Sequence, residues 1–297
     1  MFRKILIANR GEIAVRIIRA ARELGIATVA VYSTADKEAL HTLLADEAIC
    51  IGPAKSTDSY LNMNAVLSAA VLTEAEAIHP GFGFLSENSK FATMCEEVGV
   101  KFIGPSGAIM DLMGDKINAR AQMIKANVPV IPGSDGEVFT AEEALEVAEK
   151  IGYPVMLKAS AGGGGKGIRK VEKAEDLVAA FESASSEAKA AFGNGAMYME
   201  RVIYPARHIE VQILADQHGH VVHLGERDCS LQRNNQKVLE EAPSVAIGKT
   251  LRQKIGDAAV RAAQSVGYEN AGTIEFLYDE NKGEFYFMEM NTRVQVE

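Results

Sequence analysis

The pattern of hydrophobic and polar positions over residues 1–110 predicts short buried strands separated by amphipathic helices. Residues 4–8 form an apolar run typical of a buried strand, and residues 12–24 carry apolar side chains at helical spacing. The remaining strands are predicted at 28–32, 48–51, 77–79 and 101–103, and the remaining helices at about 62–73 and 88–98. Strands that alternate with helices favour a parallel, doubly wound sheet. We therefore expect an α/β domain over residues 1–113.

The pattern over residues 114–203 predicts linker helices followed by a small α/β unit. A helix is expected at 115–126, and the turn-forming composition of 130–136 indicates a boundary. The later elements are expected as a helix at 141–151, strands at 154–159 and 167–171, a helix at 174–190 and a strand at 196–202.

Long strands dominate residues 204–297. They are predicted at 207–215, 220–228, 271–279 and 284–291, with one helix near 249–266. This order favours an α+β body that is largely antiparallel. The chain stops at Glu297 directly after a strong strand, with no turn or cap. We therefore expect that the fold is cut at this point and that the body is incomplete.

Composition narrows the class of protein. The 297 residues are 47% hydrophobic and 24% charged, which is typical of a globular chain. The formal net charge of −9 argues against a basic surface for nucleic acid, so an anionic ligand must be met by a few placed cations. No stretch approaches the ~18 apolar residues that span a bilayer. The three cysteines form no C-x-x-C motif, which favours a reducing, cytoplasmic compartment over a disulfide or zinc framework.

A glycine-rich loop at 161–167 is the first motif that indicates chemistry. Consecutive glycines let backbone N–H groups approach phosphate oxygens. The loop is no Walker A motif, because Ser160 and Gly167 stand where that pattern needs Gly and Ser or Thr. It follows Lys158, which lies inside an apolar strand. We interpret the loop as a hairpin over a nucleotide, the alternative being a flexible surface turn.

A second glycine motif, Gly81-Phe82-Gly83, carries less information. It follows a predicted strand but lacks the third glycine of the dinucleotide fingerprint. The first strand-to-helix turn of the domain has no G-x-G motif either. A tight turn at the edge of the sheet is therefore favoured over NAD binding.

The last two predicted strands flank a hairpin signal at 280–283. If the turn is centred on Lys282, Glu275 lies opposite Glu289 and Asn291 lies on the same face. The opposite face would then carry Ile274, Phe276, Met288 and Met290. Directly opposed carboxylates repel, and a bound Mg²⁺ would relieve that repulsion. The alternative is a solvated charged face.

Cations that could neutralise phosphate are Lys116, Lys158 and Lys237. His208 begins a strand that alternates polar and apolar residues, and by pattern alone it is a polar-face residue.

Together these motifs resemble an ATP-grasp enzyme. Longer strings at 7–14, 77–88, 226–230 and 289–297 resemble biotin carboxylases, and the resemblance extends over the whole chain. It implies a Rossmann-like domain over 1–113, linker helices and an ATP-grasp lid over 114–203, and an incomplete ATP-grasp body over 204–297. Asn291-Thr292-Arg293 resembles the acetyl-CoA carboxylase type, whereas pyruvate carboxylases tend to have Pro in the middle position.

The resemblance implies a ligase reaction. ATP would phosphorylate bicarbonate to carboxyphosphate, whose CO₂ is taken up by biotin on a carrier protein, as the first step toward malonyl-CoA in fatty acid synthesis. The implied partners are the biotin carboxyl carrier protein and carboxyltransferase subunits, with a homodimer for the full-length protein and no nucleic acid or membrane.

The matching positions also imply residue roles. The nucleotide would contact Lys116, Lys158, Gly164, Gly165, Glu200, Arg201, Val202, Ile203, His208, Gln232, Glu275 and Glu289. Two Mg²⁺ (or Mn²⁺) ions would be held by Glu275, Glu289 and Asn291. Bicarbonate would be held by Lys237, Arg293, Val296 and Glu297. The catalytic set would be Arg293, Lys237 and Glu297, with Glu297 as the base.

Two departures from the family pattern bear on activity. Asn235 stands where the family commonly has His, which puts one contact to the nucleotide region in doubt. Family members also continue beyond Glu297, so we expect weak or partial ATP binding and incomplete carboxylation activity. The alternatives are another biotin-dependent carboxylase, another ATP-grasp ligase such as a carbamoyl phosphate synthetase-like enzyme, or a non-catalytic nucleotide-binding fragment.

Overall fold

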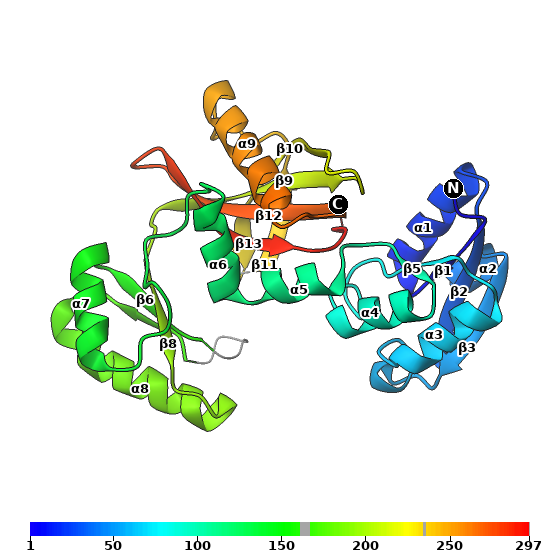
Figure 1. Ribbon diagram of the computed structural model, residues 1–297, viewed down its shortest axis with the longest axis horizontal. Helices are drawn as coiled ribbons and strands as arrows, with labels where there is room; N and C mark the ends of the chain where they lie inside the picture. The colour runs from blue at the N-terminus through cyan, green and yellow to red at the C-terminus, as the bar shows by residue number, and fades with distance from the viewer. Residues whose placement is uncertain (161–166, 234–235, 297) are drawn as a thin grey trace.

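A computed structural model describes residues 1–160, 167–233 and 236–296. Three sheets divide the chain (Figure 1): a parallel sheet at the N-terminal end, a small sheet at the opposite end, and an antiparallel sheet between them. No helix within these described ranges is both long and apolar enough to cross a membrane.

The N-terminal sheet has the strand order β3-β2-β1-β4-β5, and its pairs are parallel. Its strands are β1 (Lys4–Ile7), β2 (Ala27–Ser33), β3 (Glu47–Gly52), β4 (Ala77–His79) and β5 (Lys101–Phe102). Leu6 packs on one face with helices α3 (Met63–Leu72) and α4 (Ser89–Glu97), whereas Ile5 and Ile7 pack on the other with α1 (Gly11–Glu23). Side chains of a strand alternate between faces, so both faces are covered and the doubly wound prediction is confirmed.

The small sheet has the order β7-β6-β8 and is antiparallel. Its strands are β6 (Val155–Ala159), β7 (Arg169–Val171) and β8 (Met197–Arg201), and it packs against α7 (Ala141–Ile151) and α8 (Ala174–Phe192). Leu157, Leu177 and Met199 are fully buried between these layers. Helices α5 (Gly107–Gly114) and α6 (Lys116–Lys125) connect the N-terminal sheet to this unit.

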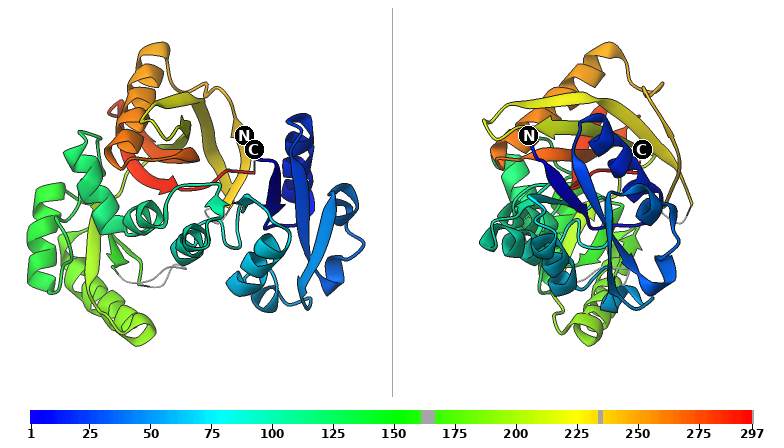
Figure 2. Two further views of the ribbon diagram at one scale, coloured as in Figure 1. Left: turned by 45° about the vertical axis from the view of Figure 1, so that its right-hand side comes forward. Right: turned by 90° about the vertical axis from the view of Figure 1, so that its right-hand side faces the viewer.

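The large antiparallel sheet has the order β11-β10-β9-β12-β13. Its strands are β9 (Ala206–Ala215), β10 (Val221–Arg233), β11 (Gln236–Glu241), β12 (Asn270–Asp279) and β13 (Glu284–Asn291). Ile213, Ile274 and Ala259 join one core, so helix α9 (Lys249–Ser265) covers one face of the sheet (Figure 2). The opposite face of the sheet carries polar side chains, which can form a binding site.

The sequence pattern did not predict every element. Helix α5, the short helix α2 (Leu40–Leu44) and strand β11 were not expected, and β10 continues to Arg233 rather than ending near residue 228. Strand β11 lies at an edge of the sheet and is rich in charged residues. Its sequence therefore lacks the alternation of apolar and polar side chains that predicts a strand.

Candidate functional site

The β12–β13 hairpin has the predicted register at the end farther from its turn, where the carboxylates lie. Glu275 pairs with Glu289, and Thr273 pairs with Asn291. A bulge after Glu275 then shifts the pairing, so that Phe276 faces Phe287. Met288 therefore lies at the bulge and lines a cleft beside Glu289, and its predicted place in the core was wrong.

Glu275 also pairs with Glu210 on its other neighbour, β9. Glu210, Glu275 and Glu289 thus form a row of three carboxylates across three adjacent strands, which we call the carboxylate row. Like charges that face each other across strands are unfavourable. The row therefore needs nearby positive charge. The surrounding side chains supply more of it to some of the three carboxylates than to others.

Fixed cations surround the first member of the carboxylate row. Glu210 is fully buried, and its two oxygens lie 2.5 Å from Arg227 Nε and 2.5 Å from Lys237 Nζ. Lys237 Nζ also lies 3.2 Å from Glu275 Oε1. Although burial opposes its charge, contact with Glu210 and Glu275 raises the pKa of Lys237 well above its usual range. Lys237 is therefore a firmly charged ammonium in the centre of the site.

The middle member of the row is held by His208. Gln232 donates its amide N–H to His208 Nδ1 at 2.7 Å, which leaves a ring proton on Nε2. That Nε2–H donates to Glu275 Oε2 at 2.6 Å. Although burial opposes the charge of Glu275, the hydrogen bond and the electrostatic interaction with His208, together with the charge of Lys237, lower its pKa to about 2. Glu275 is thus a carboxylate across the physiological range.

The last member of the row lacks such support. Within the described part of the chain, no hydrogen bond or ion pair to Glu289 is seen, and desolvation together with the charge of Glu275 raises its pKa. Its side chain nevertheless remains accessible to solvent. An accessible carboxylate with excess negative charge beside a second carboxylate suits a divalent cation with oxygen ligands. Asn291 lies next to them, but its Nδ2 rather than its oxygen faces Glu275 Oε1, at 2.7 Å.

A cleft of about 190 Å³ opens between the small sheet and β13. Two of the predicted phosphate ligands line it: Lys116, exposed in the first turn of α6, and Lys158 of β6. The Lys158 ammonium makes an ion pair with Glu200 of β8. Arg201, in contrast, donates to the Tyr286 hydroxyl at 3.1 Å, and the N–H of Val202 donates to the carbonyl of Pro154. Ile203 follows as a half-buried residue.

The segment after β13 brings Arg293 beside this face. Its Nη1 donates to Gln295 Oε1 at 2.8 Å, and its Nη2 lies 3.4 Å from Asn291 Oδ1. Gln295 is buried and donates to the Thr273 hydroxyl at 2.9 Å. Val296 is exposed. The structure therefore brings Arg293 and Asn291 together.

Some positions that the sequence singled out lie outside the described residues: the glycine-rich loop over 161–166, with Gly164 and Gly165, and also Asn235 and Glu297.

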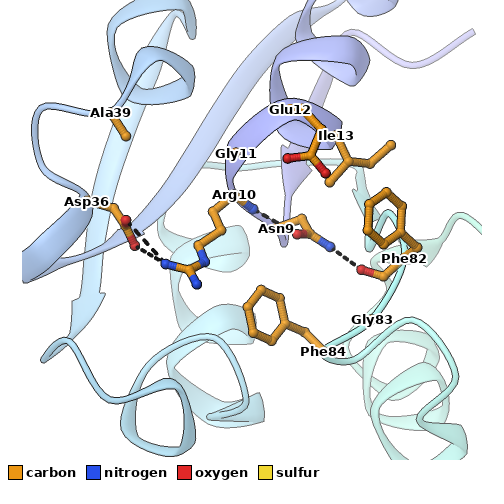
Figure 3. Close-up of a pocket in the computed structure, with 10 residues that line it drawn as sticks. All are labelled: Asn9, Arg10, Gly11, Glu12, Ile13, Asp36, Ala39, Phe82, Gly83 and Phe84. Carbon is orange, nitrogen blue, oxygen red and sulfur yellow. Dashed lines mark hydrogen bonds and ion pairs between the residues drawn. The ribbon is translucent and has the colours of Figure 1, made fainter. Parts of the chain in front are cut away.

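A second cavity, of about 450 Å³, lies at the carboxyl ends of β1 and β4 (Figure 3). The Arg10 guanidinium lies 3.4 Å from Asp36 and 5.5 Å from the centre of the Tyr60 ring. Asp36 also accepts a hydrogen bond of 2.6 Å from the Tyr60 hydroxyl. Arg10 and Asp36 therefore compensate each other's charge within the wall of this cavity, which Glu12 also lines.

Replacing Tyr60 with Phe tests that balance. Although burial opposes ionisation, hydrogen bonds from Tyr60 and Ser33 and the charge of Arg10 lower the pKa of Asp36 below its ordinary 3.8. The stabilisation from its charge is present above pH 3.8 and is lost as the pH falls below it. We expect Tyr60→Phe to cost roughly 1.5 kcal/mol of unfolding free energy at pH 7 and less at pH 3. Urea unfolding at both pH values measures this, with Tyr32→Phe as the control. An equal loss at both pH values would contradict it.

Sequence reasoning missed several residues of the site. Glu210 was seen only as part of an alternating strand, because its partners Arg227 and Lys237 come from a hairpin that was not fully predicted. The apolar lining of the cleft was also missed, and it comes from Ile117, Val130, Ile131, Phe287 and Met288. Only the bulge and the packing of α6 bring these residues together, so no local pattern marks them.

Comparison with known proteins places this geometry in a family. Residues 1–110 match the family described as "Biotin carboxylase, N-terminal domain", and residues 115–297 match "Carbamoyl-phosphate synthase L chain, ATP binding domain". Biotin carboxylase 1 of Bacillus subtilis is 58% identical over 297 residues, which cover 100% of this chain and 66% of the relative. The chain therefore spans about two thirds of the length of that relative.

Solved structures agree with the sequence match. The beta-gamma-ATP complex of biotin carboxylase from Campylobacter jejuni has a TM-score of 0.91 and 54% identity, covering 100% of this chain and 66% of that one. The biotin carboxylase domain of 2-oxoglutarate carboxylase from Hydrogenobacter thermophilus, with MgADP, ADP and bicarbonate, has a TM-score of 0.88 and 53% identity, covering 100% and 65%. The fold, the carboxylate row and these matches lead to one conclusion: the chain belongs to the biotin carboxylase family.

Proposed function

We propose that this protein is the ATP-binding portion of a biotin carboxylase, a ligase that carboxylates biotin on a carrier protein through carboxyphosphate. The observation that supports this most is the carboxylate row, which has fixed cations at Glu210 and an accessible carboxylate at Glu289 beside the cleft. The Hydrogenobacter relative, solved with MgADP and bicarbonate, adds support by similarity. In this proposal, residues 1–113, 114–203 and 204–297 are the N-terminal domain, the linker and lid, and the body.

The nucleotide would lie in the cleft between the small sheet and β13. Lys116 and Lys158 would neutralise its phosphates, and Gly164 and Gly165 would cover them. For Lys158 this requires that its ammonium leave Glu200. Glu200 to Ile203 would flank the base, with His208 and Gln232 nearby. Glu275 and Glu289, joined by Asn291, would hold Mg²⁺, which when bound neutralises phosphate charge during transfer.

Bicarbonate would lie between Lys237 and Arg293, near the backbone of Val296. The guanidinium of Arg293 suits a planar anion because its donors form a rigid fork. Glu297 would take the proton of bicarbonate, and the resulting oxyanion would attack the γ-phosphorus while ADP leaves. Lys237 keeps its proton throughout, because its partners raise its pKa, so its role is to bind and orient the anion.

The acceptor and the setting of the reaction follow from the resemblance. We propose an acetyl-CoA carboxylase complex in the cytoplasm, with biotin carboxyl carrier protein and carboxyltransferase partners and a homodimer of the full-length protein, acting in fatty acid synthesis. The second candidate is another biotin-dependent carboxylase, which the 53% identity to a 2-oxoglutarate carboxylase favours.

Isothermal titration calorimetry and phosphate release test the proposal. We expect ADP to bind more tightly with Mg²⁺ than with EDTA, and ATP hydrolysis to rise with bicarbonate and free biotin. Stimulation by ammonia in place of biotin would instead indicate a carbamoyl phosphate synthetase-like ligase. No heat on titration with MgADP would overturn the proposal and indicate a non-catalytic fragment.

A further inference from the structure

None of the residues 77–88 is among the described residues that line the nucleotide cleft, but the charge of Glu87 in this segment helps to raise the pKa of Glu289 in the carboxylate row. The segment comprises β4 and the loop that leads to α4. The loop approaches the large sheet through Glu87.

The start of the loop is held in one conformation by Asn9. The buried amide of Asn9 donates to the carbonyls of Pro80 and Phe82, both at 2.7 Å (Figure 3 shows the second bond). Gly81 has a φ of 65°, and a Cβ there would lie 2.9 Å from Asn9 Nδ2. A side chain at residue 81 would therefore displace the Asn9 amide and its two hydrogen bonds.

The end of the loop is equally constrained. The N–H of Ser86 donates to the carbonyl of Gly83 at 3.0 Å, which closes a turn. Asn88 caps α4 by accepting a hydrogen bond of 2.8 Å from the N–H of Phe91. Glu87 lies between this turn and this cap, so its backbone has little freedom.

The Glu87 carboxylate reaches two consecutive residues after β13. Its Oε1 accepts from the N–H of Thr292 at 3.1 Å and from the Thr292 hydroxyl at 3.3 Å. Its Oε2 accepts from Nε of Arg293 at 3.1 Å. Glu87 thus grips the side edge of the guanidinium through Nε.

The other contacts of Arg293 complete its orientation. Nη1 donates to Gln295 Oε1 and to the carbonyl of Val294, whereas Nη2 has a single 3.4 Å contact with Asn291 among the described residues. A guanidinium has five N–H donors, so Nη2 keeps one for an anion. The contact with Glu87 fixes the plane of the Arg293 guanidinium. The orientation of this plane determines where the remaining Nη2–H points.

We propose that Glu87 is a positioning residue for bicarbonate: it orients the Arg293 guanidinium without touching the anion. This inference rests on the proposed function, in which Arg293 binds bicarbonate. The contact between Glu87 and Arg293 links the N-terminal sheet to the anion site, because loop 80–88 follows β4 and Arg293 follows β13.

A purely structural role, tying the N-terminal unit to the large sheet, is the competing explanation. The chain offers a matched control for it. Lys101 of β5 and Glu269 make another ion pair between the same two units, at 3.4 Å, with side chains 41% and 36% exposed. The Arg293–Glu87 pair is 22% and 43% exposed. Glu269→Gln therefore removes a similar link away from the anion site.

The first experiment measures Arg293 directly. Hydrogen exchange of the Arg293 Nε–H, followed by ¹⁵N NMR and assigned with Arg293→Lys, reports the Glu87 contact. We expect Glu87→Gln to speed this exchange about tenfold, because a charge-assisted bond is lost, and Glu269→Gln to leave it unchanged. Unchanged exchange in Glu87→Gln would overturn the inference.

The second experiment measures bicarbonate. With saturating MgADP, titration of bicarbonate into Glu87→Gln should give a Kd about tenfold higher than for the parent chain, with ADP affinity unchanged. Glu87→Asp should recover part of the loss, and Glu269→Gln should match the parent chain. Equal bicarbonate affinity in Glu87→Gln, or an equal loss in Glu269→Gln, would overturn the inference. If the parent chain itself binds no bicarbonate, the anion site and the inference built on it both fail, while the exchange result still reports whether Glu87 holds Arg293.

Discussion

Replacing Glu289 with Gln is expected to abolish the gain in ADP affinity that Mg²⁺ confers. Glu289 is the accessible member of the carboxylate row, and it pairs across strands with Glu275, whose pKa is lowered to about 2. A neutral amide halves the negative charge that these two side chains offer a cation. We expect the ratio of ADP affinities with and without Mg²⁺ to fall by roughly 100-fold, measured by calorimetry in Mg²⁺ and in EDTA.

Loss of folding would not explain this result. The raised pKa of Glu289 means that its charge destabilises the folded chain as the pH rises through its ordinary range. Glu289→Gln should therefore unfold in urea at the same concentration as the parent chain at pH 7, or at a higher one. Glu284→Gln, an exposed change on the same strand, is the control and should keep the Mg²⁺ effect. A Mg²⁺ effect that survives in Glu289→Gln would remove the metal site from this hairpin.

Replacing Glu210 with Ala is expected to cost about 3 kcal/mol of unfolding free energy at pH 7. The substitution removes the carboxylate that both Arg227 and Lys237 contact at 2.5 Å, inside a buried site. Taking one partner from a buried ion pair leaves the remaining charge without compensation. Urea unfolding measures the loss.

An exposed ion pair provides the comparison. Glu187 contacts Arg169 at 2.9 Å with both side chains more than a third exposed, so Glu187→Ala should cost less than about 1 kcal/mol. If Glu210→Ala costs no more than that, Lys237 must be satisfied by Glu275 and Glu240 instead, which lie 3.2 and 3.9 Å from its Nζ.

Much of the architecture could be predicted from the sequence because most elements carry a clear period. The strand at 77–79 was expected with the bounds that β4 has, and the helix at 141–151 with those of α7. The cross-strand pair of Glu275 and Glu289 could also be predicted, since hairpin pairing depends on the position of the turn. These features are local, and the local pattern was sufficient.

The remainder of the site depends on contacts between distant segments. The bulge at Met288 moves a residue from the expected core to the cleft, and no residue type announces it. Lys158 and Glu200 meet because β6 pairs with β8, which a pattern within either strand does not specify. Glu87 and Arg293 are 206 positions apart, so only the packing of the first unit on the last reveals their contact.

The carboxylate row has a consequence for how this protein handles salts. At one end Glu210 is paired with the protein's own Arg227 and Lys237, whereas Glu289 at the other end makes no hydrogen bond or ion pair with the described residues. Within the carboxylate row, Glu289 is therefore the position at which a cation from solution can bind and be replaced by another. Divalent ions should compete with one another for that position, whereas a monovalent salt should displace them only weakly, since a single charge is attracted less strongly by the carboxylates than a double charge.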